Sequence, residues 1–307
     1  MRLTQFTYLC AIVESGFSVS KAATLLHATQ PGVSKQIRTL EQELGFDVLA
    51  RKKNRILGLT PGGEAVFEVA KRIASDTGQL KSIRGDVLSL STGQLTVATT
   101  HIHARYTLLS VIKSFCRMYP EVSFTLRHSD PAEVAELVST AKVDLGLCVP
   151  PKVMPPNLIC IPCYKVNRIL ITPTDHPLAK TRKLNLATIA RFPLVMYDPK
   201  FSSGWRILEA FERENLRPRV VLTGIDAEVL KAYVAEGLGV AFLQQLAYDQ
   251  KRDRGIEARN VDALMEPPTA VIMLRRNGYL RNFAYRFIEL ITPSLTRGAI
   301  KAALEGN

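Results

Sequence analysis

Four polar side chains between Gln30 and Arg38 have the chemistry and the spacing needed to read base pairs in DNA. Gln30, Ser34 and Arg38 follow one another at steps of four residues, with Lys35 beside them. On a helix this spacing places the four side chains along one edge. Their amide, hydroxyl and cationic groups can then form hydrogen bonds with base edges. The pattern predicts a helix that lies in the major groove, with Pro31 in its first turn.

The opposite side of this helix is apolar. Thr29 is a suitable N-cap and Gly45 a suitable stop, so we expect a helix from Gln30 to about Leu44. A short, alanine-rich helix at roughly 19–26 precedes it across a two-residue turn, which is the helix-turn-helix arrangement. The alternative is an amphipathic helical hairpin whose charged face is only solvated. Apolar side chains that should face a core recur at i, i+4, i+7 and i+11, namely Val33, Ile37, Leu40 and Leu44.

A basic segment follows at 48–59. Two short apolar runs flank its charged residues, which predicts a β-hairpin with a basic tip. Such a hairpin would act as a wing that contacts phosphates without reading sequence. The alternative is a solvated basic loop. The residues assigned to phosphate contacts are Arg51, Lys52, Lys53 and Arg55.

These N-terminal residues resemble the winged helix-turn-helix of LysR-type transcriptional regulators. The resemblance extends over the whole chain, and the segments at 98–106, 175–179, 193–197 and 224–240 are most similar to the CysB branch of that family. The string that carries the N-terminal resemblance is Ala22-Ala23, Leu26, Thr29-Gln30-Pro31, Val33-Ser34, Gln36-Ile37, Leu40-Glu41, Leu44-Gly45, Arg51 and Thr60-Pro61-Gly62-Gly63.

The resemblance implies a function and a set of partners. Members of the CysB branch regulate sulfur and sulfonate assimilation, so the expected effector is a small anion such as sulfate, a sulfonate or a related sulfur metabolite. The expected partners are double-stranded promoter DNA and further copies of the chain, in a dimer or tetramer, with RNA polymerase as a candidate. We expect no cofactor and no membrane. The alternatives are a regulator of another pathway with an organic-acid effector, and a ligand-independent architectural DNA-binding protein.

A long helix is predicted after Thr60 and Pro61. Apolar residues recur in it at alternating steps of three and four, which is typical of a seam between two helices. In a single domain this stripe would be core, whereas in LysR-type proteins the corresponding helix pairs with that of a second subunit. Linker chemistry follows from Ser89 to Gly93. The residues expected at the subunit contact are Val66, Val69, Ile73, Leu80 and Ile83.

From Gln94 onward, predicted strands and helices alternate, which indicates α/β structure with largely parallel sheets. Two such sets, with crossings near Lys165 and Pro267, resemble the two-lobed periplasmic-binding-protein fold of LysR effector domains. The fold class is therefore α+β multi-domain. We expect a winged helix-turn-helix at 1–60, a dimerisation helix at 61–90 and an effector domain at 91–307. Its lobe I would comprise about 91–165 and 268–307, and its lobe II about 166–267.

A small anion should bind between the lobes, at the carboxyl ends of strands. Thr99 and Thr100 end one strand, and Ser202 and Ser203 open a helix in the second lobe, so hydroxyls and helix N–H groups would converge. The alternative is that these residues are ordinary N-caps. The resemblance implies anion contacts at Thr100 and Ser202. The full set of expected effector residues is Thr99, Thr100, His101, Ile102, His103, Val149, Ser202 and Ser203.

Three of these positions depart from the CysB branch. Ile102 and Val149 stand where the branch has hydroxyl residues, and His103 stands where it has glutamine. Lost hydroxyls are lost donors for an oxyanion. The apolar replacements favour an organic sulfonate, or another anion with a carbon body, over bare sulfate.

Composition narrows the class of protein. The chain has 307 residues, 47% hydrophobic and 22% charged, which fits two or three globular units. Its net charge of +12 suggests a polyanionic partner. No apolar run approaches the roughly 18 residues of a membrane span, so we expect a cytoplasmic protein. The five cysteines fit a reducing compartment, and Cys160 and Cys163 should point to opposite faces of a strand.

Catalytic motifs are missing from the sequence. We find no GxSxG, HExxH, GxxxxGK[ST] or GxGxxG in the required context. We expect no enzyme, no catalytic residues and no bound metal. A free solute-binding protein would share the two lobes but not the DNA-binding region, and ligand-dependent footprints on DNA would separate a regulator from an architectural protein.

Overall fold

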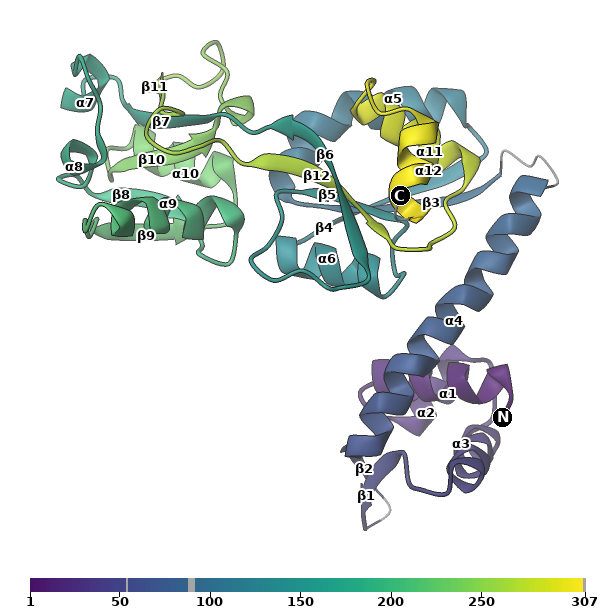
Figure 1. The fold of residues 1–307 in the computed structure, drawn as a ribbon. Helices are drawn as coiled ribbons and strands as arrows, with labels where there is room; N and C mark the ends of the chain where they lie inside the picture. Colours follow the sequence, from purple (N-terminus) through teal and green to yellow (C-terminus); the bar gives the residue numbers. More distant parts are fainter. Residues whose placement is uncertain (54, 88–91, 306–307) are drawn as a thin grey trace. The chain divides into compact units, whose positions relative to one another are not determined.

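The computed structural model describes residues 1–53, 55–87 and 92–305 (Figure 1). They belong to two compact units, Met1–Leu88 and Ser89–Asn307. Most of the predicted linker from Ser89 to Gly93 lies outside the described residues.

The first unit consists of helices around one apolar core, followed by a hairpin and a long helix. The stripe predicted for the recognition helix forms the centre of this core, since Val33, Ile37 and Leu40 are fully buried together with Leu9 and Ile12 of the first helix. The elements are α1 (Leu3–Glu14), α2 (Val19–Leu25), α3 (Gln30–Leu44), β1 (Leu49–Lys52), β2 (Arg55–Leu59) and α4 (Pro61–Val87).

The predicted helix ends and hairpin are confirmed. The Thr29 hydroxyl accepts the N–H of Gly32 at the start of α3, and Gly45 ends that helix in the left-handed conformation. Strands β1 and β2 pair antiparallel, with Lys52 opposite Arg55. Helix α1 has no clear apolar stripe in the sequence, because apolar residues occur on several of its sides, so periodicity does not predict it.

The second unit contains two five-stranded sheets, one in each lobe. Their strand orders are β4-β3-β5-β12-β6 and β11-β7-β10-β8-β9. In each sheet a single strand, β12 or β7, runs against its neighbours. Each of these strands is the first that the chain forms after crossing between lobes, at 166–167 and 261–268, close to the positions expected near Lys165 and Pro267.

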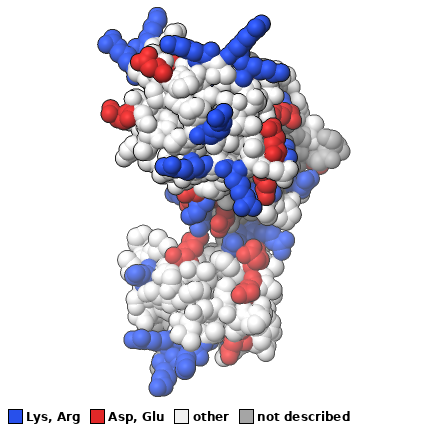
Figure 2. All heavy atoms as spheres, turned by 90° about the vertical axis from the view of Figure 1, so that its left-hand side faces the viewer, with Lys and Arg blue, Asp and Glu red and all other residues white. Residues whose placement is uncertain are grey.

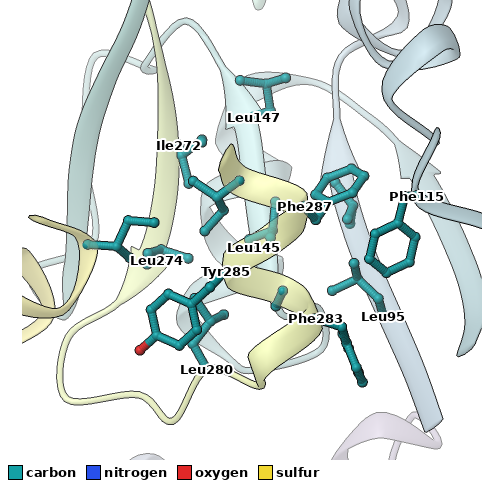
Figure 3. Packing of buried hydrophobic residues seen from close by; sticks show 14 of the residues in the cluster. Leu95, Phe115, Leu145, Leu147, Ile272, Leu274, Leu280, Phe283, Tyr285 and Phe287 are labelled. Carbon is teal, nitrogen blue, oxygen red and sulfur yellow. The ribbon is translucent and has the colours of Figure 1, made fainter. Parts of the chain in front are cut away.

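Lobe I has an aromatic core between its sheet and helices. Phe115 lies 5.3 Å from Phe287 between ring centroids, and both side chains are fully buried. Figure 3 shows Phe283, Tyr285 and Phe287 on α11, packed with Leu95 and other strand residues. The elements are β3 (Gly93–Thr99), η1 (His103–Thr107), α5 (Leu108–Met118), β4 (Val122–His128), α6 (Pro131–Ser139), β5 (Leu145–Cys148), β6 (Leu158–Lys165), β12 (Thr269–Arg275), α11 (Asn282–Ile291) and α12 (Arg297–Glu305).

Lobe II repeats the plan and adds two short helices of four residues, α7 and α8. Its two apolar clusters lie on either face of the sheet, one around Phe211 and Phe242 and the other around Ile171 and Leu230. The elements are β7 (Arg168–Pro173), α7 (Pro177–Lys180), α8 (Leu186–Ile189), β8 (Leu194–Tyr197), α9 (Ser202–Arg213), β9 (Val220–Gly224), α10 (Ala227–Ala235), β10 (Val240–Gln244), η2 (Gln245–Ala247) and β11 (Ile256–Asn260).

Candidate functional site

The residues predicted to read DNA lie on the exposed side of α3. Gln30, Pro31, Lys35 and Arg38 are exposed and Ser34 is half-buried. The Gln30 side-chain oxygen accepts a hydrogen bond from the Ser20 hydroxyl of α2 at 3.1 Å. This bond fixes one end of the face, and the other side chains project from a helix whose opposite side is anchored in the core.

The basic hairpin divides into two roles. Lys52, Lys53 and Arg55 are exposed. Figure 2 shows lysine and arginine side chains gathered at the end of this unit where the β1–β2 hairpin lies. Arg51 differs, because its guanidinium bonds both oxygens of the buried Glu41 carboxylate, at 3.1 and 2.8 Å.

Glu41 joins the recognition helix to the wing. One of its carboxylate oxygens also accepts the N–H groups of Val48 and Leu49, both at 3.0 Å. Because Arg51 balances the charge of this carboxylate, its first role is to hold the hairpin against α3. The sequence pattern alone had grouped Arg51 with the phosphate contacts and gave Glu41 no role.

The apolar residues predicted to form a subunit contact on α4 fall into two groups. Val66 packs against the core of its own unit. Farther along the helix Ile73 is half-buried, whereas Val69, Leu80 and Ile83 are 43%, 65% and 36% exposed. Large apolar side chains exposed along one stripe are typical of a surface that a second helix covers. The subunit contact therefore remains a prediction for these four residues, without Val66.

A pocket of about 510 Å³ lies between the lobes of the second unit. Of the predicted effector residues, it is lined by Thr100, His101, Ile102, His103 and Val149 from lobe I and by Ser202 and Ser203 from lobe II.

Thr99 is a correction to the predicted set. Its side chain is fully buried and its hydroxyl donates to the Leu147 carbonyl at 2.6 Å, so it belongs to the sheet and not to the pocket. Successive strand side chains point to opposite faces. Thr100 consequently faces the pocket, and within the described residues its hydroxyl has no hydrogen-bond partner.

The helix that follows Thr100 brings a neutral histidine to the pocket. Burial lowers the pKa of His103 to about 4, so the ring carries no charge at neutral pH. Its Nδ1 lies 2.8 Å from the Tyr164 hydroxyl, which in turn lies 3.0 Å from the Thr107 hydroxyl. His103 can therefore offer a hydrogen bond to a ligand but no positive charge.

In lobe II the start of α9 forms the facing wall. The N-cap is Phe201, so Ser202 and Ser203 lie inside the first turn and are not ordinary caps. The Ser202 hydroxyl donates to the carbonyls of Val149 and Pro150 in lobe I, at 3.2 and 3.0 Å. Ser202 therefore links the two lobes, and its backbone N–H, not its hydroxyl, is the group free to meet an anion.

Other contacts also join the lobes across the pocket. Ile102 of lobe I packs in an apolar cluster of lobe II. His101 Nδ1 lies 3.6 Å from the Asp226 carboxylate, and Arg105 lies 3.7 Å from Glu228, which also accepts the Tyr106 hydroxyl. The two carboxylates on this side of the pocket, Asp226 and Glu228, are therefore already paired with side chains of lobe I. The side of the pocket formed by Thr100 and Ser203 remains available for an anion.

Two pocket residues that the sequence analysis did not select carry buried polar atoms without partners. These atoms are the Tyr197 hydroxyl and the Gln244 side-chain oxygen. Burial raises the pKa of Tyr197, which therefore remains a hydroxyl donor at neutral pH. Unpaired buried polar atoms are uncommon, so these two are available to bind a polar ligand in the pocket. Both residues end strands, which was the only signal in the sequence.

The described residues offer neither a cluster of metal ligands nor a membrane-spanning helix. They contain no cluster of three or more His, Cys, Asp or Glu side chains able to hold a metal. No helix among them is long and apolar enough to cross a bilayer. The five cysteines are free, and Cys160 and Cys163 lie in β6 as predicted.

A winged helix-turn-helix joined to a two-lobed unit with a pocket between the lobes defines a ligand-responsive transcriptional regulator. The chain belongs to the LysR family of these regulators. Residues 3–64 match the bacterial regulatory helix-turn-helix model of the lysR family, and residues 89–296 match the LysR substrate binding domain.

Individual relatives cover the whole chain. The transcriptional regulator SsuR of Burkholderia cenocepacia is 36% identical over 99% of each chain. CysB of the same organism is 35% identical over 100% of this chain and 98% of its own. The solved cofactor-binding domain of the Cbl transcriptional regulator superimposes with a TM-score of 0.66 at 33% identity, over 70% of this chain and 95% of that domain.

Proposed function

We propose that this LysR-family regulator binds promoter DNA through α3 and the β1–β2 hairpin, and that a small anion between its lobes controls it. The observation that carries the anion proposal is the pocket itself. It combines the free Thr100 hydroxyl with the starts of two helices, whose first N–H groups have no intrahelical partner. Such N–H groups favour negative charge.

The proposed effector is sulfate or, preferably, an organic sulfonate. Polar donors line one side of the pocket, while Ile102, Val149 and Phe201 provide apolar surface. Bare sulfate has no carbon body to cover that surface. Control of sulfur or sulfonate metabolism genes follows from the resemblance to SsuR, CysB and Cbl, and the exposed stripe on α4 supports a homo-oligomer.

Two kinds of DNA contact should be separable by mutation. Arg38→Ala should weaken binding to the operator by about 1–3 kcal/mol, because a bidentate contact to a base edge is lost. Lys53→Ala should instead weaken binding to every DNA sequence to a similar degree. It should also reduce the slope of log affinity against log salt concentration by about one. The measurement is fluorescence anisotropy at several salt concentrations, with an operator selected from random duplexes by the parent protein and a scrambled duplex of equal length.

Lys35→Ala provides a second test of the reading face. If Arg38→Ala and Lys35→Ala lose affinity for operator and scrambled DNA to the same extent, these side chains contact phosphates and do not read bases.

The two neighbouring threonines offer a matched test of the effector pocket. Thr100→Val should weaken anion binding about ten- to a hundredfold, because one charge-assisted hydrogen bond of about 1.5–3 kcal/mol disappears. Thr99→Val should leave affinity unchanged and lower the free energy of unfolding by about 1 kcal/mol, because only the bond to Leu147 is lost. Calorimetry with sulfate, alkanesulfonates and carboxylates measures the first effect, and urea unfolding followed at Trp205 measures the second.

A parent-like affinity in Thr100→Val would place the pocket elsewhere. Tighter binding of carboxylates than of every sulfonate would favour an organic-acid effector and remove the proposed link to sulfur metabolism.

A further inference from the structure

The most unusual buried charge in the second unit is Arg168, the first residue of β7. Only 4% of its surface is exposed, and its Nη2 is buried without a hydrogen-bond partner. Among the described residues, no carboxylate oxygen lies within 4 Å of the Arg168 guanidinium, which is the limit for an ion pair. The guanidinium also makes no hydrogen bond within this part of the chain. A buried guanidinium normally has such a partner, because removing its charge from water is costly.

The acidic side chain that contacts the Arg168 backbone already accepts other hydrogen bonds. Asp262 accepts the backbone N–H of Arg168 at 2.7 Å with one oxygen and the Asn260 amide at 2.8 Å with the other. Burial, together with the positive charge of Arg206, lowers the pKa of Arg168 to about 10, so the guanidinium remains charged at neutral pH. The protein thus holds a positive charge in its interior and places a second arginine near it.

A cavity of about 280 Å³ adjoins this guanidinium. Besides Arg168, it is lined by Ile207, Phe242 and Pro268, and it shares Val149, Ser202, Ser203 and Gln244 with the pocket between the lobes. These four shared residues form the boundary between the two spaces. The cavity therefore lies directly behind the proposed effector pocket.

Polar groups of the boundary complete an anion site. The Gln244 amide bonds the Ser203 hydroxyl at 3.2 Å, while its oxygen is buried without a partner. Rotation of this amide by 180° exchanges its nitrogen and oxygen at little cost, since the Ser203 hydroxyl can donate as well as accept. The Gln244 NH₂ then becomes a second donor beside Arg168.

We propose that this cavity is an oxyanion compartment in which Arg168 binds a sulfate, sulfonate or carboxylate group. The oxyanion is either a free inorganic ion, bound in addition to the effector, or the head group of an effector whose carbon body lies between the lobes in place of the anion proposed there. The inference shares the ligand class of the proposed function but assigns the counter-charge to a different residue, outside the Thr100 side of the pocket.

The test uses the full-length protein and three arginine variants. Arg168→Met removes the charge at similar volume, and Arg168→Lys keeps the charge but loses the planar fork. Arg191→Met is the matched control, because it removes the same charge from an exposed site in the same lobe. The probes are sodium sulfate and the sodium salts of methane-, propane- and pentanesulfonate, titrated by calorimetry at constant ionic strength.

We expect Arg168→Met to bind these probes at least tenfold more weakly than Arg191→Met, with partial recovery in Arg168→Lys. Without ligand, Arg168→Met should melt no lower than the parent, because an unpaired buried charge has been removed. An affinity that increases with alkyl length identifies the head group of an effector, and equal affinity for sulfate and all sulfonates identifies a free ion.

Equal binding by Arg168→Met and Arg191→Met would overturn the inference, and loss of binding in Thr100→Val would then still support the proposed function. If Arg168→Met weakens binding of the probes and Thr100→Val does not, the inference is supported and the proposed function is contradicted. If Arg168→Met does not fold, the affinity of Arg168→Lys for the probes tests the inference instead. Parent-like affinity in that variant would count against binding of the oxyanion by the planar guanidinium of Arg168. A parent protein that binds none of the probes would overturn both proposals.

Discussion

Replacement of Glu41 by alanine is expected to lower the free energy of unfolding of the DNA-binding unit by about 3–5 kcal/mol, because two buried backbone donors lose their acceptor at about 1–3 kcal/mol each and the half-exposed Arg51 guanidinium loses its ion-pair partner. The loss is large because this one carboxylate accepts two backbone N–H groups as well as the Arg51 guanidinium. Without it, all of these donors lose their acceptor. The wing should then separate from α3 and bind DNA weakly.

Hydrogen exchange of residues 30–59 in the full-length protein measures this effect locally. Glu43→Ala is the matched control on the same helix, because Glu43 is exposed and water screens its ion pair with the N-terminus, at 2.6 Å, so its loss should cost little stability. Equal exchange rates in the two variants would show that Glu41 does not hold the wing.

The second large effect is expected on assembly. Leu80→Asp should shift the sedimentation of the protein to smaller species, because a carboxylate buried in an apolar helix contact costs several kcal/mol that dissociation removes. The fold of the single chain should survive, since the Leu80 side chain is 65% exposed.

Leu57→Asp is the control for the same substitution at equal exposure. Leu57 is 63% exposed and lies in the hairpin, away from the α4 stripe. Unchanged sedimentation of Leu80→Asp, or an equal shift in both variants, would contradict a subunit contact on this stripe.

Helices, hairpin and lobes could be predicted because their signals are local. The α3 stripe and its caps lie within one segment, and alternating apolar runs mark the strands of both lobes. Helix α1 and strand β11 were not predicted, since neither shows a clear period. The short helices α7 and α12 were also not predicted.

The site could be predicted only in part. Sequence spacing brought Thr100, Ile102 and Ser203 to one pocket, because strand and helix ends meet between the lobes. It could not separate Thr99 from Thr100, since their roles depend on which face of the sheet each side chain meets. It also could not show that the Ser202 hydroxyl is occupied by carbonyls some 50 residues earlier in the chain.

By itself, the sequence determined the winged helix-turn-helix and the two α/β lobes, because periodicity, caps and turn residues act over a few positions, while its motifs carried the resemblance to the LysR family. Only the tertiary structure decided which charges are paired and which polar atoms are left open. Arg51 proved to be bound by Glu41, whereas Arg168, Tyr197 and Gln244 carry buried atoms without partners. Burial and pairing depend on residues distant in sequence that folding brings together, and no local pattern contains that information.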